Sequence, residues 1–205
     1  MAFREERLRV VGVGGTLREG SASFGALRRA LAAAGEAGAE TELLDLRELD
    51  LPQSGPGLAL DEYGPGVGRL VEGLCGADAV LISTAAYHGT LAGVTKNALD
   101  FAQFLSGGDH PYFDGKVVGL ISTAGGEQAG ANAIGAMVHV VHALRGVVAP
   151  LMVPISKAWQ RTDDAGNVTD ELYGRRLDSL GELVVDLAGR LAARDERVDL
   201  AGVAG

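Results

Sequence analysis

The sequence predicts an α/β fold in which a five-stranded parallel sheet is covered by helices on both faces, in a three-layer sandwich. Short runs of consecutive Val, Ile and Leu alternate with longer amphipathic stretches, as buried strands and helices do in βαβ units. The chain has 205 residues, enough for one such domain, and it shows no internal repeat or linker. We therefore expect residues 1–205 to form a single domain.

The elements alternate regularly along the chain. The expected strands are Leu8–Val13, Glu42–Leu46, Ala79–Thr84, Val117–Thr123 and Val147–Val153. The expected helices are Phe24–Gly38, Gly68–Gly76, Leu91–Leu105, Gly130–Arg145 and Glu171–Arg194. Two polar segments, Pro52–Gly66 and Ser156–Asp170, are predicted loops, and the tail 195–205 is expected to fray.

Charge and cysteine content exclude several classes of function. Lys and Arg number 18 against 27 Asp and Glu, a net charge of −9, so nucleic acid is not an expected partner. A lone cysteine, Cys75, permits neither an internal disulfide nor a cysteine-based metal site, and on its apolar helix it is expected in the core. His139 and His142 have no accompanying carboxylate, so no metal is expected. The charged N-terminus and the lack of a long apolar run predict a cytoplasmic protein without membrane contact.

The loops after the first, third and fourth strands are the candidate site, because parallel sheets bind ligands beyond the carboxyl ends of their strands. The first loop supplies three hydroxyls and one guanidinium, from Thr16, Ser21, Ser23 and Arg18, and it leads into a helix. Helix N–H groups, hydroxyls and Arg together favour a phosphate. A structural role, with Ser21 or Ser23 capping the helix and Arg18 in solvent, stays open beside it.

Two common nucleotide-binding loops do not match. A GxGxxG fingerprint beginning at Gly12 fails at Leu17, where glycine is required. The spacing from Gly15 to Gly20 resembles a P-loop, but Ser21 follows where the phosphate-binding Lys is required. Neither a dinucleotide on this loop nor ATP is expected.

The loop after the third strand carries the most specific motif. Residues 85–101 read AAYHGTLAGVTKNALDF. They resemble PEYNGSxPGxLKNAIDW of the NADPH-dependent FMN reductase family, a flavodoxin-like group that includes quinone, azo-dye and chromate reductases. Ala85 and Ala86 replace the Pro-Glu pair, His88 replaces Asn, and Ala92 replaces Pro.

The other two loops resemble the same family, and the resemblance covers roughly residues 8–153. The family's first loop reads approximately GSxRxxSxN, and Gly15, Arg18 and Ser21 match it, with Thr16 in place of Ser and Ser23 in place of Asn. Residues 122–126 resemble its Ser/Gly-rich flavin loop.

The resemblance implies a flavodoxin-like oxidoreductase that passes hydride from NADPH, or NADH, to FMN. Electrons then go to a quinone-like or other small-molecule acceptor, or reduced flavin is supplied to a monooxygenase. The FMN-binding residues it implies are Thr16, Arg18, Ser21 and Ser23 for the phosphate, Ala86, Tyr87, His88 and Gly89 for one ring edge, and Thr123, Gly125 and Gly126 for the other. It also implies a homodimer or homotetramer, with the helix starting near Ala92 at the dimer interface.

Several alternatives stay open at this stage. His88 is the candidate catalytic residue, as a proton donor to the reduced acceptor, or else an ordinary surface residue. Trp159 covers the flavin, covers a neighbouring subunit or packs internally. A flavodoxin-like electron carrier is disfavoured by Arg18 and by the motif around Tyr87. A flavin-free partner protein that retains the fold is compatible with the altered residues 85–88.

Overall fold

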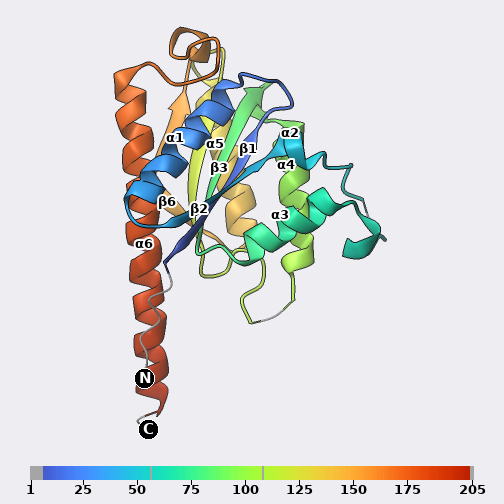
Figure 1. The fold of residues 1–205 in the computed structure, drawn as a ribbon, viewed down its shortest axis with the longest axis vertical. Helices are drawn as coiled ribbons and strands as arrows, with labels where there is room; N and C mark the ends of the chain where they lie inside the picture. Colours follow the sequence, from blue (N-terminus) through green and yellow to red (C-terminus); the bar gives the residue numbers. More distant parts are fainter. Residues whose placement is uncertain (1–6, 56, 108, 204–205) are drawn as a thin grey trace.

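A computed structural model describes residues 7–55, 57–107 and 109–203 of the chain (Figure 1). Within these residues five strands run parallel in the order β2-β1-β3-β5-β6, which confirms the predicted sheet. They are β1 (Arg9–Gly15), β2 (Glu40–Asp45), β3 (Ala79–Tyr87), β5 (Val117–Thr123) and β6 (Val147–Ile155). The short β4 (Thr90–Leu91) pairs antiparallel with β3. The connections reverse direction beside β1 and β3, and such a switch point is where doubly wound sheets bind ligands.

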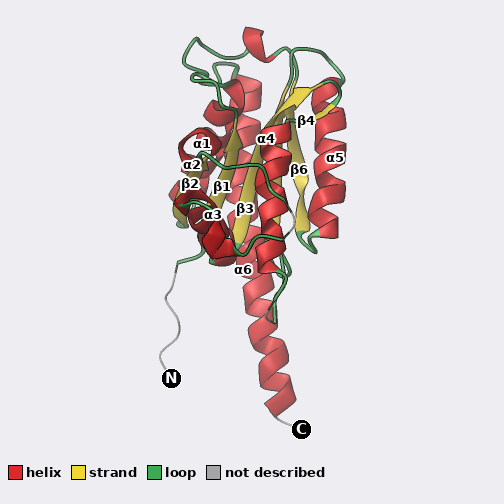
Figure 2. Ribbon diagram, turned by 90° about the vertical axis from the view of Figure 1, so that its right-hand side faces the viewer, coloured by secondary structure: helices red, strands yellow, loops and turns green. Residues whose placement is uncertain are grey.

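Helices cover both faces of the sheet (Figure 2). Helices α1 (Ala22–Glu36) and α6 (Glu171–Val203) lie on one face. Helices α3 (Pro65–Cys75), α4 (Gly93–Asp100) and α5 (Ala129–Ala143) lie on the other. The shorter elements are α2 (Leu46–Leu49), η1 (Leu60–Glu62), η2 (Phe101–Leu105) and η3 (Ala158–Gln160).

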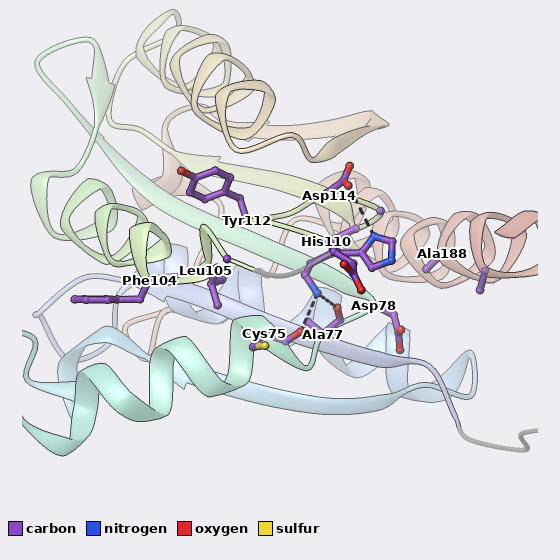
Figure 3. A pocket seen from close by; sticks show the side chains of 14 residues that line it. Cys75, Ala77, Asp78, Phe104, Leu105, His110, Tyr112, Asp114 and Ala188 are labelled. Atoms are coloured by element: carbon purple, nitrogen blue, oxygen red, sulfur yellow. Dashed lines mark hydrogen bonds and ion pairs between the residues drawn. The ribbon is translucent and has the colours of Figure 1, made fainter. Parts of the chain in front are cut away.

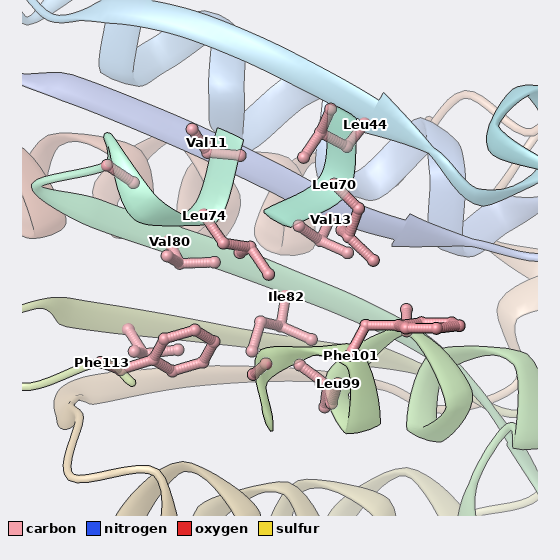
Figure 4. Packing of buried hydrophobic residues seen from close by; sticks show 14 of the residues in the cluster. Val11, Val13, Leu44, Leu70, Leu74, Val80, Ile82, Leu99, Phe101 and Phe113 are labelled. Atoms are coloured by element: carbon pink, nitrogen blue, oxygen red, sulfur yellow. The ribbon is translucent and has the colours of Figure 1, made fainter. Parts of the chain in front are cut away.

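The strands are buried on both sides, which explains their continuous apolar sequences. Successive side chains of a strand point to opposite faces. Val11 and Val13 of β1 therefore lie in the layer of α3 to α5, in one cluster with Leu70 and Ile82 (Figure 4). Val10 lies in the opposite layer, against α1 and α6.

Helices α1 and α6 approach each other closely through small residues. A Cβ on Gly181 would lie 2.2 Å from the carbonyl oxygen of Ala30. Beside this contact the guanidinium of Arg29 donates to both carboxylate oxygens of Asp178, at 2.8 and 2.7 Å. These hydrogen bonds lower the pKa of Asp178 and raise the pKa of Arg29, because they favour the charged forms. Together the close approach and the ion pair fix α1 against α6, and the N-terminus of α1 borders the candidate site.

The predicted helix Leu91–Leu105 begins too early and is not uniform. Leu91 belongs to the β3–β4 hairpin, α4 begins at Gly93, and the chain tightens into η2 at Phe101. Thr84 explains the late start, because its hydroxyl accepts the N–H of Ala92 at 3.0 Å and holds that residue in extended geometry as the N-cap.

Other boundaries also differ from the sequence analysis. Cys75 is exposed, so its predicted core position is wrong; it ends α3 one residue beyond the fully buried Leu74. Helix α3 starts within the predicted loop, with Pro65 in its first turn, where the missing N–H costs no hydrogen bond. Helix α6 continues past Arg194 to Val203, into the tail for which the sequence predicts fraying; residues 204–205 lie outside the described residues.

Candidate functional site

A hollow of about 400 Å³ lies at the carboxyl ends of β1, β3 and β5, where the sequence analysis places the site. Its volume lies in the range typical of cofactor pockets. All three predicted loops line it, together with residues of the 156–170 segment. Its lining residues are Thr16, Arg18, Gly20, Ser21, Ala22, Ala85, Ala86, Tyr87, Thr123, Ala124, Gly125, Ala158, Trp159, Thr162, Asp163 and Asp164.

The first loop turns sharply and ends at the N-terminus of α1. Gly15 and Gly20 have φ values of 95° and 64°, a conformation that glycine adopts without strain. The hydroxyl of Thr16 accepts the N–H of Arg18 at 3.1 Å. Because the first N–H groups of a helix have no acceptor within it, this end of α1 offers donors to an anion.

The two serines of the first loop bind each other. The hydroxyl oxygens of Ser21 and Ser23 lie 2.8 Å apart, and both side chains are buried. Ser21 is the N-cap residue of α1, but its side chain makes no capping hydrogen bond. The alternative in which the Ser21 hydroxyl caps the helix is therefore wrong. Ser21 lines the hollow and Ser23 lies outside its lining.

The second loop is the tight turn of the β3–β4 hairpin. Ala86 pairs with Leu91, while His88 (φ 50°) and Gly89 (φ 85°) form the turn itself. Ala86 and Tyr87 line the hollow, whereas His88 and Gly89 are exposed beyond its lining. The proposed proton-donor role of His88 therefore stays a prediction without support from its position.

The third loop is tied to the 156–170 segment. The N–H of Ala158 donates to the carbonyl of Ala124 at 2.9 Å. Lys157 forms an ion pair with Glu127 at 2.5 Å, and this contact lowers the pKa of Glu127. Thr123 and Gly125 line the hollow, and Gly126 does not. These links set Trp159, 70 % exposed, at the edge of the hollow.

A tight turn at residues 163–167 completes the wall. The carboxylate of Asp163 accepts the backbone N–H of Asn167 at 2.8 Å and its side-chain amide at 3.0 Å. These bonds lower the pKa of Asp163, chiefly through the side-chain amide, so the group is an anion near neutral pH. The turn lies directly on α1, since a Cβ on Gly25 would meet the carbonyl oxygen of Gly166 at 1.9 Å.

Sequence reasoning missed Thr162, Asp163 and Asp164 as site residues. The Asp-Asp-Ala-Gly-Asn sequence is typical of a turn, and it lies within the predicted loop Ser156–Asp170. Nothing local in that signal indicates that the turn returns to the first loop.

Part of the second motif has a structural role. The amide of Asn97 donates to the carbonyl of Pro52 and accepts the N–H of Ser54, both at 2.8 Å. Lys96 pairs with Asp100 one helical turn away. None of these residues lines the 400 Å³ hollow. Asn97 thereby holds the long loop after α2 against α4.

A larger hollow, about 610 Å³, lies at the opposite end of the sheet (Figure 3). The Nζ of Lys116 lies there and donates to the carbonyls of Cys75 and Ala77 at 2.9 and 2.5 Å, and burial lowers its pKa. This hollow borders the amino ends of β3 and β5. Parallel sheets bind ligands beyond the carboxyl ends of their strands, so the smaller hollow is the candidate functional site.

Across the described part of the chain, no group of three or more His, Cys, Asp or Glu side chains is placed to hold a metal ion. No helix in the described ranges combines the length and apolar character needed to cross a membrane.

Known proteins similar to this chain include flavin-dependent reductases. A family model described as NADPH-dependent FMN reductase matches residues 8–160. An FMN-dependent NADPH-azoreductase of Staphylococcus aureus is 32 % identical over 117 residues, 56 % of this chain and 58 % of that relative. The alignment thus spans less than two thirds of that relative's length.

Two solved structures share the fold. FerB from Paracoccus denitrificans, a flavoenzyme NAD(P)H:(acceptor) oxidoreductase, has a TM-score of 0.69 at 24 % identity, covering 89 % of this chain and 98 % of that one. An azoreductase from Bacillus anthracis has a TM-score of 0.60 at 17 % identity, covering 87 % and 99 %. At these identities the likeness concerns the fold alone.

Proposed function

Because the chain belongs to the NADPH-dependent FMN reductase family, we propose that it binds FMN in the 400 Å³ hollow and uses NADPH to reduce it. The observation that carries the proposal is the convergence of three loops, distant in sequence, on one hollow at the switch point of the sheet. A small-molecule acceptor, such as a quinone-like compound, then takes the electrons.

The first loop has the donors that a phosphate requires. Arg18, the hydroxyls of Thr16 and Ser21, and the N-terminus of α1 border the hollow together. Charge-assisted hydrogen bonds from such groups are about twice as strong as neutral ones. Ser23 would act indirectly, by holding the Ser21 hydroxyl.

The rest of the hollow suits a polyol chain and a planar ring. The carboxylates of Asp163 and Asp164 accept hydrogen bonds from hydroxyl groups, which a ribityl chain supplies. Ala85 and Ala86 have only methyl side chains and Gly125 has none, so the backbone can approach a ring closely. FMN, when bound, supplies the hydride and electron chemistry, and these residues orient it and limit water around it.

A second copy of the chain is the partner we propose, in a homodimer or homotetramer. Leu17, Tyr87 and Trp159 expose 62 %, 55 % and 70 % of their surfaces, and the latter two line the hollow. Exposed apolar groups beside a site are typical of a surface that a partner or substrate covers. The proposed location is the cytoplasm, and the alternative to a small-molecule acceptor is the supply of reduced flavin to a monooxygenase.

Flavin absorbance tests this function directly. The purified protein with FMN should show a bound-flavin absorbance band at about 450 nm, and this band should bleach anaerobically after one equivalent of NADPH is added. Arg18→Gln should weaken FMN binding about tenfold or more, and leave binding of riboflavin, which lacks the phosphate, unchanged. Absence of FMN binding would indicate a flavin-free protein, and bound flavin that neither NADPH nor NADH bleaches would indicate an electron carrier.

A further inference from the structure

A second, smaller hollow lies on the other side of the first loop. It measures about 130 Å³, and three arginines from separate parts of the chain line it: Arg18 of the loop, Arg28 of α1 and Arg47 of α2. Glu19 and Asp45 are its acidic lining residues. In a chain of net charge −9, three guanidinium groups around one small hollow mark a site for an anion.

The arginines keep hydrogen-bond donors available. Asp45 caps α2 by accepting the backbone N–H of Arg47 at 2.9 Å, and the Nη2 of Arg47 forms a long ion pair with the same carboxylate at 3.5 Å. Arg28 uses one Nη2 donor for the side-chain oxygen of Asn167. Among the described residues the guanidinium of Arg18 makes no hydrogen bond or ion pair. Since each guanidinium has five N–H donors, most remain free for a ligand.

The hollow adjoins the proposed flavin site. Thr16, Arg18, Gly20 and Ser21 line both hollows, so only the first loop separates them. A ligand long enough to cross the first loop can therefore contact residues of both hollows. NADPH is an extended ligand, and it differs from NADH by one phosphate on the adenosine ribose.

We propose that Arg28 and Arg47, in the hollow they share with Arg18, bind the 2′-phosphate of NADPH while Arg18 holds the phosphate of FMN, and that they so set a preference for NADPH over NADH. This inference rests on the proposed function and adds to it the residues that select the reductant. A phosphomonoester carries close to two negative charges near neutral pH and presents three acceptor oxygens. Arginine side chains match that geometry with paired donors.

Calorimetry tests the site without any turnover. The FMN-loaded protein is titrated with adenosine 2′,5′-bisphosphate and, separately, with 5′-AMP, which lacks the 2′-phosphate. The bisphosphate should bind more tightly, and Arg47→Gln should reduce that preference about tenfold or more, with Arg47→Lys in between. Arg190→Gln is the matched control. Arg190 pairs with Asp186 on α6, outside both hollows, so this substitution removes the same charge without changing either hollow.

Flavin bleaching by each nucleotide gives the second readout. The ratio of bleaching rates with low concentrations of NADPH and NADH should fall about tenfold in Arg47→Gln, with the NADH rate unchanged. Equal binding of the two adenosine nucleotides, or an unchanged preference in Arg47→Gln, would overturn the inference. Weaker FMN binding in Arg47→Gln would instead place the flavin phosphate in this hollow. Failure of both NADPH and NADH to bleach the wild-type flavin would refute the proposed function. The binding preference for adenosine 2′,5′-bisphosphate over 5′-AMP is measured by calorimetry without flavin reduction, so it tests the arginine hollow separately.

Discussion

The contact between α1 and the 163–167 turn can be tested by Gly25→Ala. A Cβ on Gly25 would lie 1.9 Å from the carbonyl oxygen of Gly166 and 2.7 Å from its carbonyl carbon. Both atoms belong to the backbone, so no change of rotamer relieves the overlap. The turn must therefore move away from the helix, and it carries Asp163 and Asp164 with it.

Two opposing terms determine the size of the effect. Replacing glycine by alanine inside an unobstructed helix stabilises it by about 1 kcal/mol. Overpacking a well-packed contact costs about 1–3 kcal/mol, and an approach of 1.9 Å belongs at the upper end. The free energy of unfolding should fall by about 2 kcal/mol, or about 4–8 °C in Tm for a domain of this size.

Urea and thermal unfolding of the apoprotein measure this change. Gly35→Ala is the matched control, because it lies in the same helix and its Cβ would meet only the Thr41 side chain, at 3.7 Å. That variant should be neutral or more stable by up to about 1 kcal/mol. Weaker FMN binding should accompany Gly25→Ala and not Gly35→Ala. If Gly25→Ala stabilises the protein as Gly35→Ala does, the turn does not lie against α1 and the described wall of the hollow is wrong.

Further predictions concern three other contacts. Trp159 is the one tryptophan of the sequence and lines the hollow, so FMN binding should quench its fluorescence; FMN that binds without quenching lies elsewhere. Thr84→Val should lower the free energy of unfolding by about 1–3 kcal/mol, since the buried N–H of Ala92 loses its acceptor, and urea unfolding without a loss would contradict the role of Thr84. Asp178→Asn should cost about 0.5–1 kcal/mol at pH 7, because the pair with Arg29 is more than one third exposed. The pKa of Asp178 is lower in the folded protein than in the unfolded chain, where it is about 3.9. The stabilisation by the ion pair is therefore fully present at pH values above the unfolded-state pKa, and it is lost as the pH falls through the folded-state pKa. A stability difference between wild type and Asp178→Asn that is equal at pH 7 and pH 2 would rule out the ionic contribution.

Much of the fold can be predicted because its signals are local. Runs such as Val117–Thr123 are buried on both faces, and only a central parallel strand needs that pattern. The loops that follow β1, β3 and β5 are equally local, and parallel strands bring their carboxyl ends to one edge. The sequence alone therefore predicts that Thr16, Ala86 and Thr123 converge, and all three line the 400 Å³ hollow.

Errors arose where a local pattern has two solutions. The apolar residues around Leu91 fit a helix as well as a short strand, and the Thr84 hydroxyl, seven positions earlier, selects the strand. Cys75 carries an apolar side chain in an apolar helix, and its place on the exposed side depends on how the end of α3 meets the sheet.

The sequence by itself determined the α/β class, the strand positions and the loops that form the proposed flavin site, since periodicity and glycine placement act over a few residues. Only the tertiary structure decided that the 163–167 turn lies on α1 and that Arg47 joins Arg18 and Arg28 at one hollow. Those contacts join segments far apart in the chain. Their geometry follows from how helices and strands pack together, and no local pattern of residue types encodes it.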